Sequence, residues 1–156
     1  MQIQLSQKER MLLEDEKHQE GICIKKYQNY AEQAQDSQLK QLFNKLAGEE
    51  QHHYNIIDQM LQGQQPNLSH GQQPMAQGGQ MQQSSYQGAM SNAGDEVLCS
   101  DLLATEKYVS GTYDTGIFEA VNPVIRQALQ HIQHDEQQHG QDLFNYMNSH
   151  GMYNVK

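Results

Sequence analysis

The sequence lacks the features that mark secreted, disulfide-linked and membrane-spanning proteins. Only two cysteines occur in 156 residues, Cys23 and Cys99, and they form neither a CxxC motif nor a disulfide framework. No apolar run approaches the roughly 20 residues that a bilayer-spanning helix requires. The N-terminal MQIQLSQKER contains no apolar stretch typical of a signal peptide. We therefore expect synthesis in the cytoplasm without a signal peptide, two reduced core thiols and no membrane partner.

Basic residues are also scarce, with 10 Lys and Arg against 19 Asp and Glu and a formal net charge of −9. Such a surface repels nucleic-acid phosphates, so we expect no nucleic-acid partner. Between Gly63 and Gly94 there is no Lys, Arg, Asp or Glu at all, and Gln, Gly, Ser and Met dominate. A segment of this composition cannot bury enough apolar surface to fold alone. It predicts a flexible linker over residues 63–94.

On both sides of this linker, apolar residues recur at helical spacing. Signals for helix ends stand at matching places: the capping box of Ser6 and Glu9, the turns at Asp36–Ser37 and Asn122–Pro123, and the stops at Gly63 and Gly151. The pattern predicts one helical hairpin over about 6–62 and a second over about 95–150. The two hairpins and the linker would form a single domain over residues 1–156.

The two halves align without a gap when the first is shifted by 86 positions. Glu20 recurs as Glu106, Glu50 as Glu136 and His53 as His139, and Leu12, Asp15, Tyr27, Ala34, Gln41 and Gln51 also recur unchanged. We interpret this as an internal duplication of a helical hairpin. Two such hairpins predict an all-α four-helix bundle.

Six polar residues fall within the apolar stripes of the predicted helices, where a solvated face would not place them. In each half, a Glu lies 16 residues before the turn at Asp36 or Asn122, and a Glu-x-x-His pair lies 14 and 17 residues after it. Equal distances from the turn of an antiparallel hairpin place side chains at one height. We therefore expect these six residues to meet in the middle of the bundle: Glu20, Glu50, His53, Glu106, Glu136 and His139.

Four buried carboxylates without compensation would strongly destabilise the fold. Two divalent cations would neutralise them, and a Glu and a His three residues apart share a helix face, so both can reach one ion. Carboxylate and imidazole together suit iron, manganese or zinc. The spacing therefore predicts that the six residues bind two divalent metal ions, with iron or manganese preferred over zinc. The alternative is a polar layer that holds no metal.

Other polar residues near this set are expected to be less important. Glu16, one turn before Glu20, is its rival as the ligand from the first helix, but its counterpart 86 positions later is Leu102. Tyr27 and Tyr113 are expected to be plain core aromatics, with a redox role or contacts to the ligands as the alternative. Glu49-x-x-His52 is interpreted as a chance pair. The remaining histidines, His18, His52, His70, His131, His134 and His150, are expected on the surface or in the linker.

The six spaced residues resemble those of ferritin-like di-iron and di-manganese proteins across both hairpins. That resemblance implies two short-loop hairpins joined by a long crossover, which 32 residues can easily span. In the second half, DLLATEKYVSGTYDTGIFEAVNPVIRQ (101–127) and LFNYMNSHGMY (143–153) resemble the spore coat F family. This second resemblance implies a structural protein of the spore coat, with other coat proteins or further copies of the chain as partners.

The preferred prediction is thus a spore coat-associated structural protein whose bundle binds a di-metal centre. An enzymatic role is the less favoured reading, and catalytic residues are unknown. If the protein is an enzyme, we expect a di-iron or di-manganese redox protein of the ferroxidase, peroxidase or catalase kind that uses the same six ligands.

Overall fold

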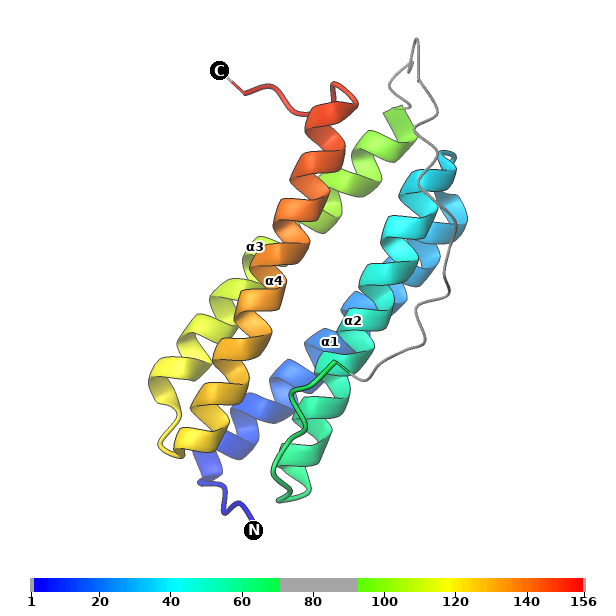
Figure 1. Ribbon diagram of the computed structural model, residues 1–156. Coiled ribbons are helices and arrows are strands. Elements are labelled where there is room, and N and C mark those ends of the chain that lie inside the picture. The colour runs from blue at the N-terminus through cyan, green and yellow to red at the C-terminus, as the bar shows by residue number, and fades with distance from the viewer. Residues whose placement is uncertain (1, 71–92, 156) are drawn as a thin grey trace.

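The computed structural model describes residues 2–70 and 93–155 and arranges four α-helices as a bundle (Figure 1). The helices are α1 (Gln7–Gln33), α2 (Ser37–Leu61), α3 (Ala93–Glu119) and α4 (Pro123–Ser149). The expected all-α four-helix bundle is confirmed, since the described residues contain no strand beyond an isolated bridge between Gln2 and Gln64. In this described part of the chain, no helix has the length and apolar character needed to cross a membrane.

The helix ends follow the signals in the sequence. Ser6 and Glu9 form the reciprocal capping box at the start of α1. The side chains of Asp36 and Asn122 each accept a hydrogen bond from the backbone N–H two residues later, at the starts of α2 and α4. Just beyond the ends of these two helices, the glycines at 63 and 151 have φ of 78° and 69°, a conformation that glycine adopts without strain.

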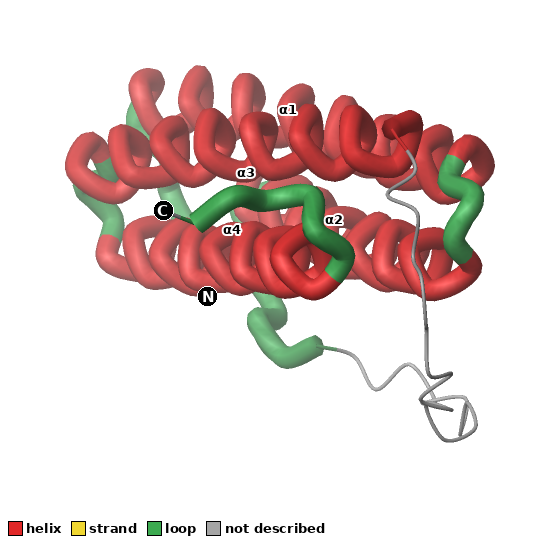
Figure 2. Tube along the Cα trace, turned by 90° about the horizontal axis from the view of Figure 1, so that it is seen from above, coloured by secondary structure: helices red, strands yellow, loops and turns green. Residues whose placement is uncertain are grey.

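The helices form two hairpins, α1 with α2 and α3 with α4, which meet through contacts of α1 with α3 and of α2 with α4 (Figures 1 and 2). Helix α2 ends at the end of the bundle where α1 begins, whereas α3 begins at the opposite end (Figure 1). The end of α2 and the start of α3 therefore lie at opposite ends of the bundle. Of the predicted linker, residues 71–92 lie outside the described residues.

Each hairpin carries an acidic residue that holds the turn of the other. Glu9 on α1 accepts hydrogen bonds of 2.8 Å from both backbone N–H groups of residues 121–122, in the turn between α3 and α4. Asp95 on α3 accepts bonds of 3.0 and 3.1 Å from the N–H groups of residues 35–36, in the turn between α1 and α2. These paired contacts are related by the same 86-position shift, so the two halves match in structure as they do in sequence.

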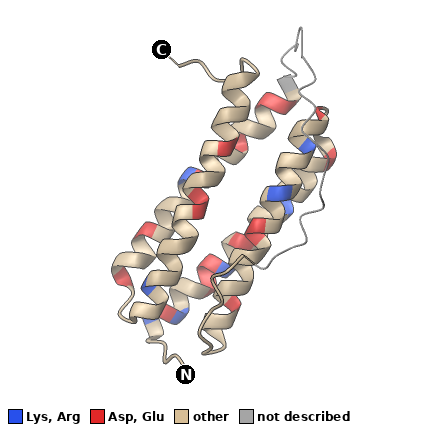
Figure 3. Ribbon diagram, in the orientation of Figure 1, with Lys and Arg blue, Asp and Glu red and all other residues tan. Residues whose placement is uncertain are grey.

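The buried apolar residues form two separate clusters along the bundle. One includes Tyr27, Phe43, Leu46, Leu102 and Leu143, and the other includes Leu13, Ile57, Val109, Tyr113 and Ile132. Along α2, Leu46 belongs to the first cluster and Ile57 to the second, and the residues between them include buried Glu50 and His53. Acidic residues are spread along all four helices (Figure 3), but only a few are buried, and most of these lie in this layer between the clusters.

Candidate metal centre

The polar layer brings together the six residues that the sequence predicts as ligands. Each of the four helices contributes one Glu, and α2 and α4 also contribute one His each; all six side chains are 0–3% exposed. Their donor atoms form two groups in which all atoms lie within 4.8 Å of one another. The first group contains Glu20, Glu50, His53 and Glu136, and the second contains Glu50, Glu106, Glu136 and His139. Glu50 and Glu136 therefore belong to both groups, between the two histidines.

The two imidazole rings face the shared carboxylates in the same way. Nδ1 of His53 lies 3.2 Å from Oε2 of Glu50 and 3.0 Å from Oε1 of Glu136. Nδ1 of His139 lies 3.1 Å from Oε1 of Glu50 and 3.7 Å from Oε2 of Glu136. The rings are stacked with centroids 5.5 Å apart. Both Nδ1 atoms thus point into the layer, toward the oxygen atoms of the same two acids.

The other nitrogen of each imidazole contacts an acid that sequence reasoning missed. Nε2 of His53 lies 3.0 Å from Oδ2 of Asp135, and Nε2 of His139 lies 2.6 Å from Oε2 of Glu49. Glu49 thus contacts the histidine of the other hairpin, a contact that its interpretation as part of a chance pair with His52 did not anticipate. A signal was present in the sequence, because Glu49 and Asp135 are both acidic, both directly precede a predicted ligand, and are 86 positions apart. These acids fix the orientation of the rings.

The two buried tyrosines also contact the predicted ligands, which corrects their interpretation as plain core aromatics. Tyr27 donates a hydrogen bond from its hydroxyl to Oε1 of Glu106, and Tyr113 donates one to Oε1 of Glu20. Each tyrosine belongs to one hairpin and its acceptor to the other. The histidines likewise contact acids of the other hairpin, His53 with Asp135 and His139 with Glu49. Hydrogen bonds around the polar layer therefore join the two hairpins.

Burial and mutual contact shift the protonation of the layer. Burial and the neighbouring Glu50 carboxylate raise the pKa of Glu20 well above its usual range, and burial and Glu136 do the same for Glu106. Burial opposes the charged form of each imidazole, yet carboxylate partners hold the pKa of His53 and of His139 well above the ordinary value. In the metal-free protein, protons therefore supply positive charge to the layer.

The unpaired atoms of the layer indicate room for further ligation. Within the described residues, one oxygen each of Glu20, Glu106 and Glu136 is buried without a hydrogen-bond partner. Buried polar atoms of this kind are rare in native proteins and call for an explanation. Three carboxylates and one imidazole per group form a donor set that suits iron, manganese or zinc. The residues present therefore fit a pair of divalent metal ions.

Glu20, and not Glu16, joins this layer. Glu16 is also buried, one helical turn away, and accepts a hydrogen bond of 3.1 Å from the hydroxyl of Thr112. Burial raises the pKa of Glu16 to about 7. Because the unfolded chain binds this proton less tightly, the free energy of unfolding should fall as pH rises from about 4.5 through 7.

Replacing Glu16 by Gln should remove this pH-dependent penalty while keeping an acceptor for Thr112. We expect the free energy of unfolding of the metal-free protein to rise by about 3 kcal/mol at pH 8 and to change little at pH 5. Urea unfolding at the two pH values measures the difference. Glu14→Gln, at an exposed position of the same helix, is the matched control. Equal effects of Glu16→Gln at both pH values would contradict the assignment.

Comparison with known proteins agrees with this architecture. Residues 9–84 match the family model for rubrerythrin, a ferritin-like family, and residues 94–156 match the model for the Coat F domain. No curated protein and no solved structure matches the chain. The helices and the rubrerythrin match define a ferritin-like helical bundle. Together, the two family matches support a member of the spore coat F family with ferritin-like affinity.

The match to the Coat F domain implies association with other coat proteins and suggests the spore coat as the location. The rubrerythrin match and the buried clusters of Glu and His suggest metal binding.

Proposed function

We propose that the chain is a structural protein of the spore coat whose bundle is held together by two divalent metal ions. The observation that supports this most is the sharing of Glu50 and Glu136 between the two four-residue groups. Glu20 and His53 would complete the shell of one ion, and Glu106 and His139 that of the other. Every helix would then supply at least one ligand, so the bound ions would link both hairpins.

The charges and the burial of the layer support a structural centre. Two divalent ions match the charge of four carboxylates, and the side chains around them are almost fully enclosed. Structural sites are closed by protein ligands, whereas catalytic sites keep an open position. We propose iron or manganese as the resident metal and zinc as the third choice. Other coat proteins or further copies of this chain would be the partners of the rigid bundle.

A redox function is the second candidate, and the two tyrosines favour it. The hydroxyls of Tyr27 and Tyr113 are bonded directly to Glu106 and Glu20, which are proposed ligands. Bound iron or manganese would supply one-electron chemistry toward oxygen or peroxide. In that case Tyr27 would hold the carboxylate of Glu106 in place, and Tyr113 that of Glu20. Each tyrosine would keep its hydroxyl proton at the Oε1 atom of the carboxylate that it contacts.

Metal content after anaerobic loading with Mn(II) or Fe(II) tests the proposal. The wild-type protein should retain two more ions per chain than a Glu50→Ala/Glu136→Ala variant, since that variant loses both shared ligands. A Glu14→Gln/Glu32→Gln variant, which removes two exposed charges, should retain as many ions as wild type. Equal metal content in wild type and the Ala variant would overturn the proposal. If the wild-type protein does bind the two additional ions, oxygen consumption by its Fe(II)-loaded form would favour the redox candidate over a purely structural role.

A further inference from the structure

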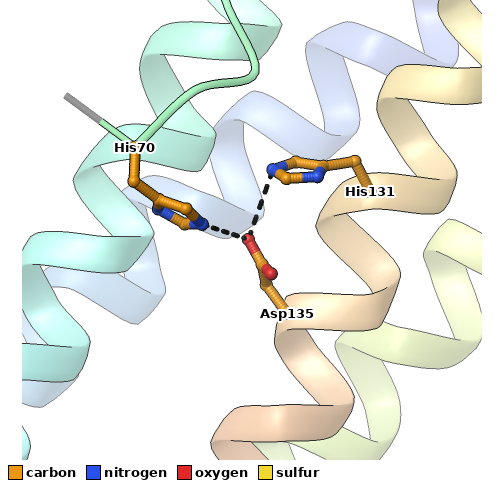
Figure 4. A group of neighbouring side chains, drawn as sticks. All are labelled: His70, His131 and Asp135. Carbon is orange, nitrogen blue, oxygen red and sulfur yellow. Dashed lines mark ion pairs between the residues drawn. The ribbon is translucent and has the colours of Figure 1, made fainter.

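A second cluster of potential metal ligands lies on the outer side of the buried layer, around Asp135 of α4. Oδ2 of Asp135, which also contacts His53, lies 3.6 Å from Nε2 of His131 and 3.5 Å from Nε2 of His70 (Figure 4). His131 is one turn earlier on α4, and His70 is on the segment that follows α2. Figure 4 shows both imidazoles turned toward the same carboxylate. Two chain segments distant in sequence therefore converge on one acid.

The spacing of these atoms suits metal ligation better than direct hydrogen bonding. Contacts of 3.5–3.6 Å are too long for good hydrogen bonds between nitrogen and oxygen. Two ligands bound tetrahedrally to one ion, each at about 2.1 Å, lie about 3.4 Å apart. The separations between Asp135 and each of the two histidines thus resemble those between ligands of a common ion. The donor atoms of all three residues lie within 4.8 Å of one another.

Unpaired imidazole nitrogens point to the same conclusion. Within the described residues, Nε2 of His131 and Nε2 of His52 are buried without a hydrogen-bond partner. His52 lies beside His70, with ring centroids 5.0 Å apart, and His70 lies beside His131 at 5.7 Å. Three imidazoles thus lie side by side at this edge of the buried layer, and two of them carry a nitrogen without a partner among the described residues.

The matching place in the other half of the bundle has a lysine beside the corresponding acid. Glu49, the counterpart of Asp135, has Lys45 one turn earlier, with Nζ 3.9 Å from Oε1. Lys45 occupies the position that corresponds to His131 after the 86-position shift. Asp135 has only histidines as ion-pair partners among the described residues. The first half therefore places the charged side chain of Lys45 beside Glu49. The second half places imidazoles, which can bind a cation, beside Asp135.

We propose that His70, His131 and Asp135 bind one divalent transition-metal cation at the outer edge of the buried layer, with His52 available as a fourth ligand. Two or three imidazoles and one carboxylate select cations such as Zn(II), Co(II), Ni(II) or Fe(II) over Mg(II) and Ca(II), which prefer oxygen ligands. This site is separate from the proposed buried centre. It requires none of the four buried glutamates.

Zn(II) binding to a Glu50→Gln/Glu136→Gln variant tests the outer site by itself. Calorimetric titration should give about one ion per chain, and adding His70→Ala and His131→Ala should weaken this binding at least tenfold. Adding His131→Lys, which copies the Lys45 arrangement, should abolish it because a fixed cation then faces Asp135. Adding His18→Ala and His134→Ala, at two exposed positions, should leave it unchanged.

Equal Zn(II) affinity in the His70→Ala/His131→Ala and His18→Ala/His134→Ala combinations would overturn the proposal. If the glutamine background does not fold, the same substitutions in the wild-type chain should lower Zn(II) stoichiometry by one ion. The two proposals fail separately: loss of the buried centre leaves the single outer ion, and loss of the outer site leaves the two buried ions.

Discussion

Filling both buried sites with Mn(II) should raise the free energy of unfolding by about 4 kcal/mol per ion when free Mn(II) is 1,000 times the dissociation constant. The reason is that the ions bind only the folded chain, where four helices bring the ligands together. In the metal-free protein, protons on buried acids and imidazoles compensate the layer only in part, and three carboxylate oxygens keep no partner. Urea unfolding with Mn(II) and with a chelator measures the gain.

The control for this experiment has to separate the buried centre from the outer cluster. We therefore place the measurement in the His70→Ala/His131→Ala background, where only the buried ligands remain. In this background, the further change Glu50→Gln/Glu136→Gln should abolish the stabilisation by Mn(II), although both side chains keep their size. An unfolding curve that does not respond to Mn(II) in the parent background would contradict the di-metal proposal.

Local chemistry explains why the helices could be predicted from the sequence. The caps at Ser6, Asp36 and Asn122 depend on a side chain and a backbone group a few residues apart, so the sequence alone specifies them. Distance from a turn likewise depends on one hairpin only. It correctly placed Glu20 at the level of Glu50 and His53. Because the two hairpins are of similar length and pack together, the three predicted ligands of the first hairpin then meet the three of the second.

Contacts between the hairpins could not be predicted in the same way. Distance from a turn gives a height along the bundle but does not say which side of the partner hairpin a residue faces. Glu49 and Asp135 are one residue, or about 100° of helix rotation, away from the buried stripe, so periodicity marks them as outward-facing. Only the relative rotation of α2 and α4 shows that each reaches the histidine of the other. Tyr27 and Tyr113 were misinterpreted for the same reason.

The outer cluster was beyond prediction for another reason. His70 belongs to a segment without helical periodicity, and its place beside His52 depends on the path of residues 63–70 after α2. That path is held by the bond from the N–H of Ile3 to the carbonyl of Gly63 and by the packing of Leu68 against the core. Neither contact leaves a pattern in the sequence.

Replacing His53 by Ala should lower the free energy of unfolding of the metal-free protein by about 3–5 kcal/mol. His53 is fully buried and contacts Glu50, Asp135 and Glu136 through its two nitrogens. Its loss would leave Glu50 and Glu136, both almost fully buried, without their shared cationic partner. His139→Ala should have a similar effect, because His139 makes the matching contacts. The exposed His18→Ala should have almost none, and urea unfolding measures all three.

A double-mutant cycle shows whether the loss comes from uncompensated charge or from the cavity left by the ring. Glu136→Gln keeps the size of the side chain but removes its charge, so it should restore part of the stability lost in His53→Ala. A cavity would be unaffected by that change, and the two substitutions would then be additive. Non-additivity of at least about 1 kcal/mol supports charge as the cause. Strict additivity would mean that His53 stabilises the metal-free bundle by packing, and that its carboxylate contacts matter only when metal is bound.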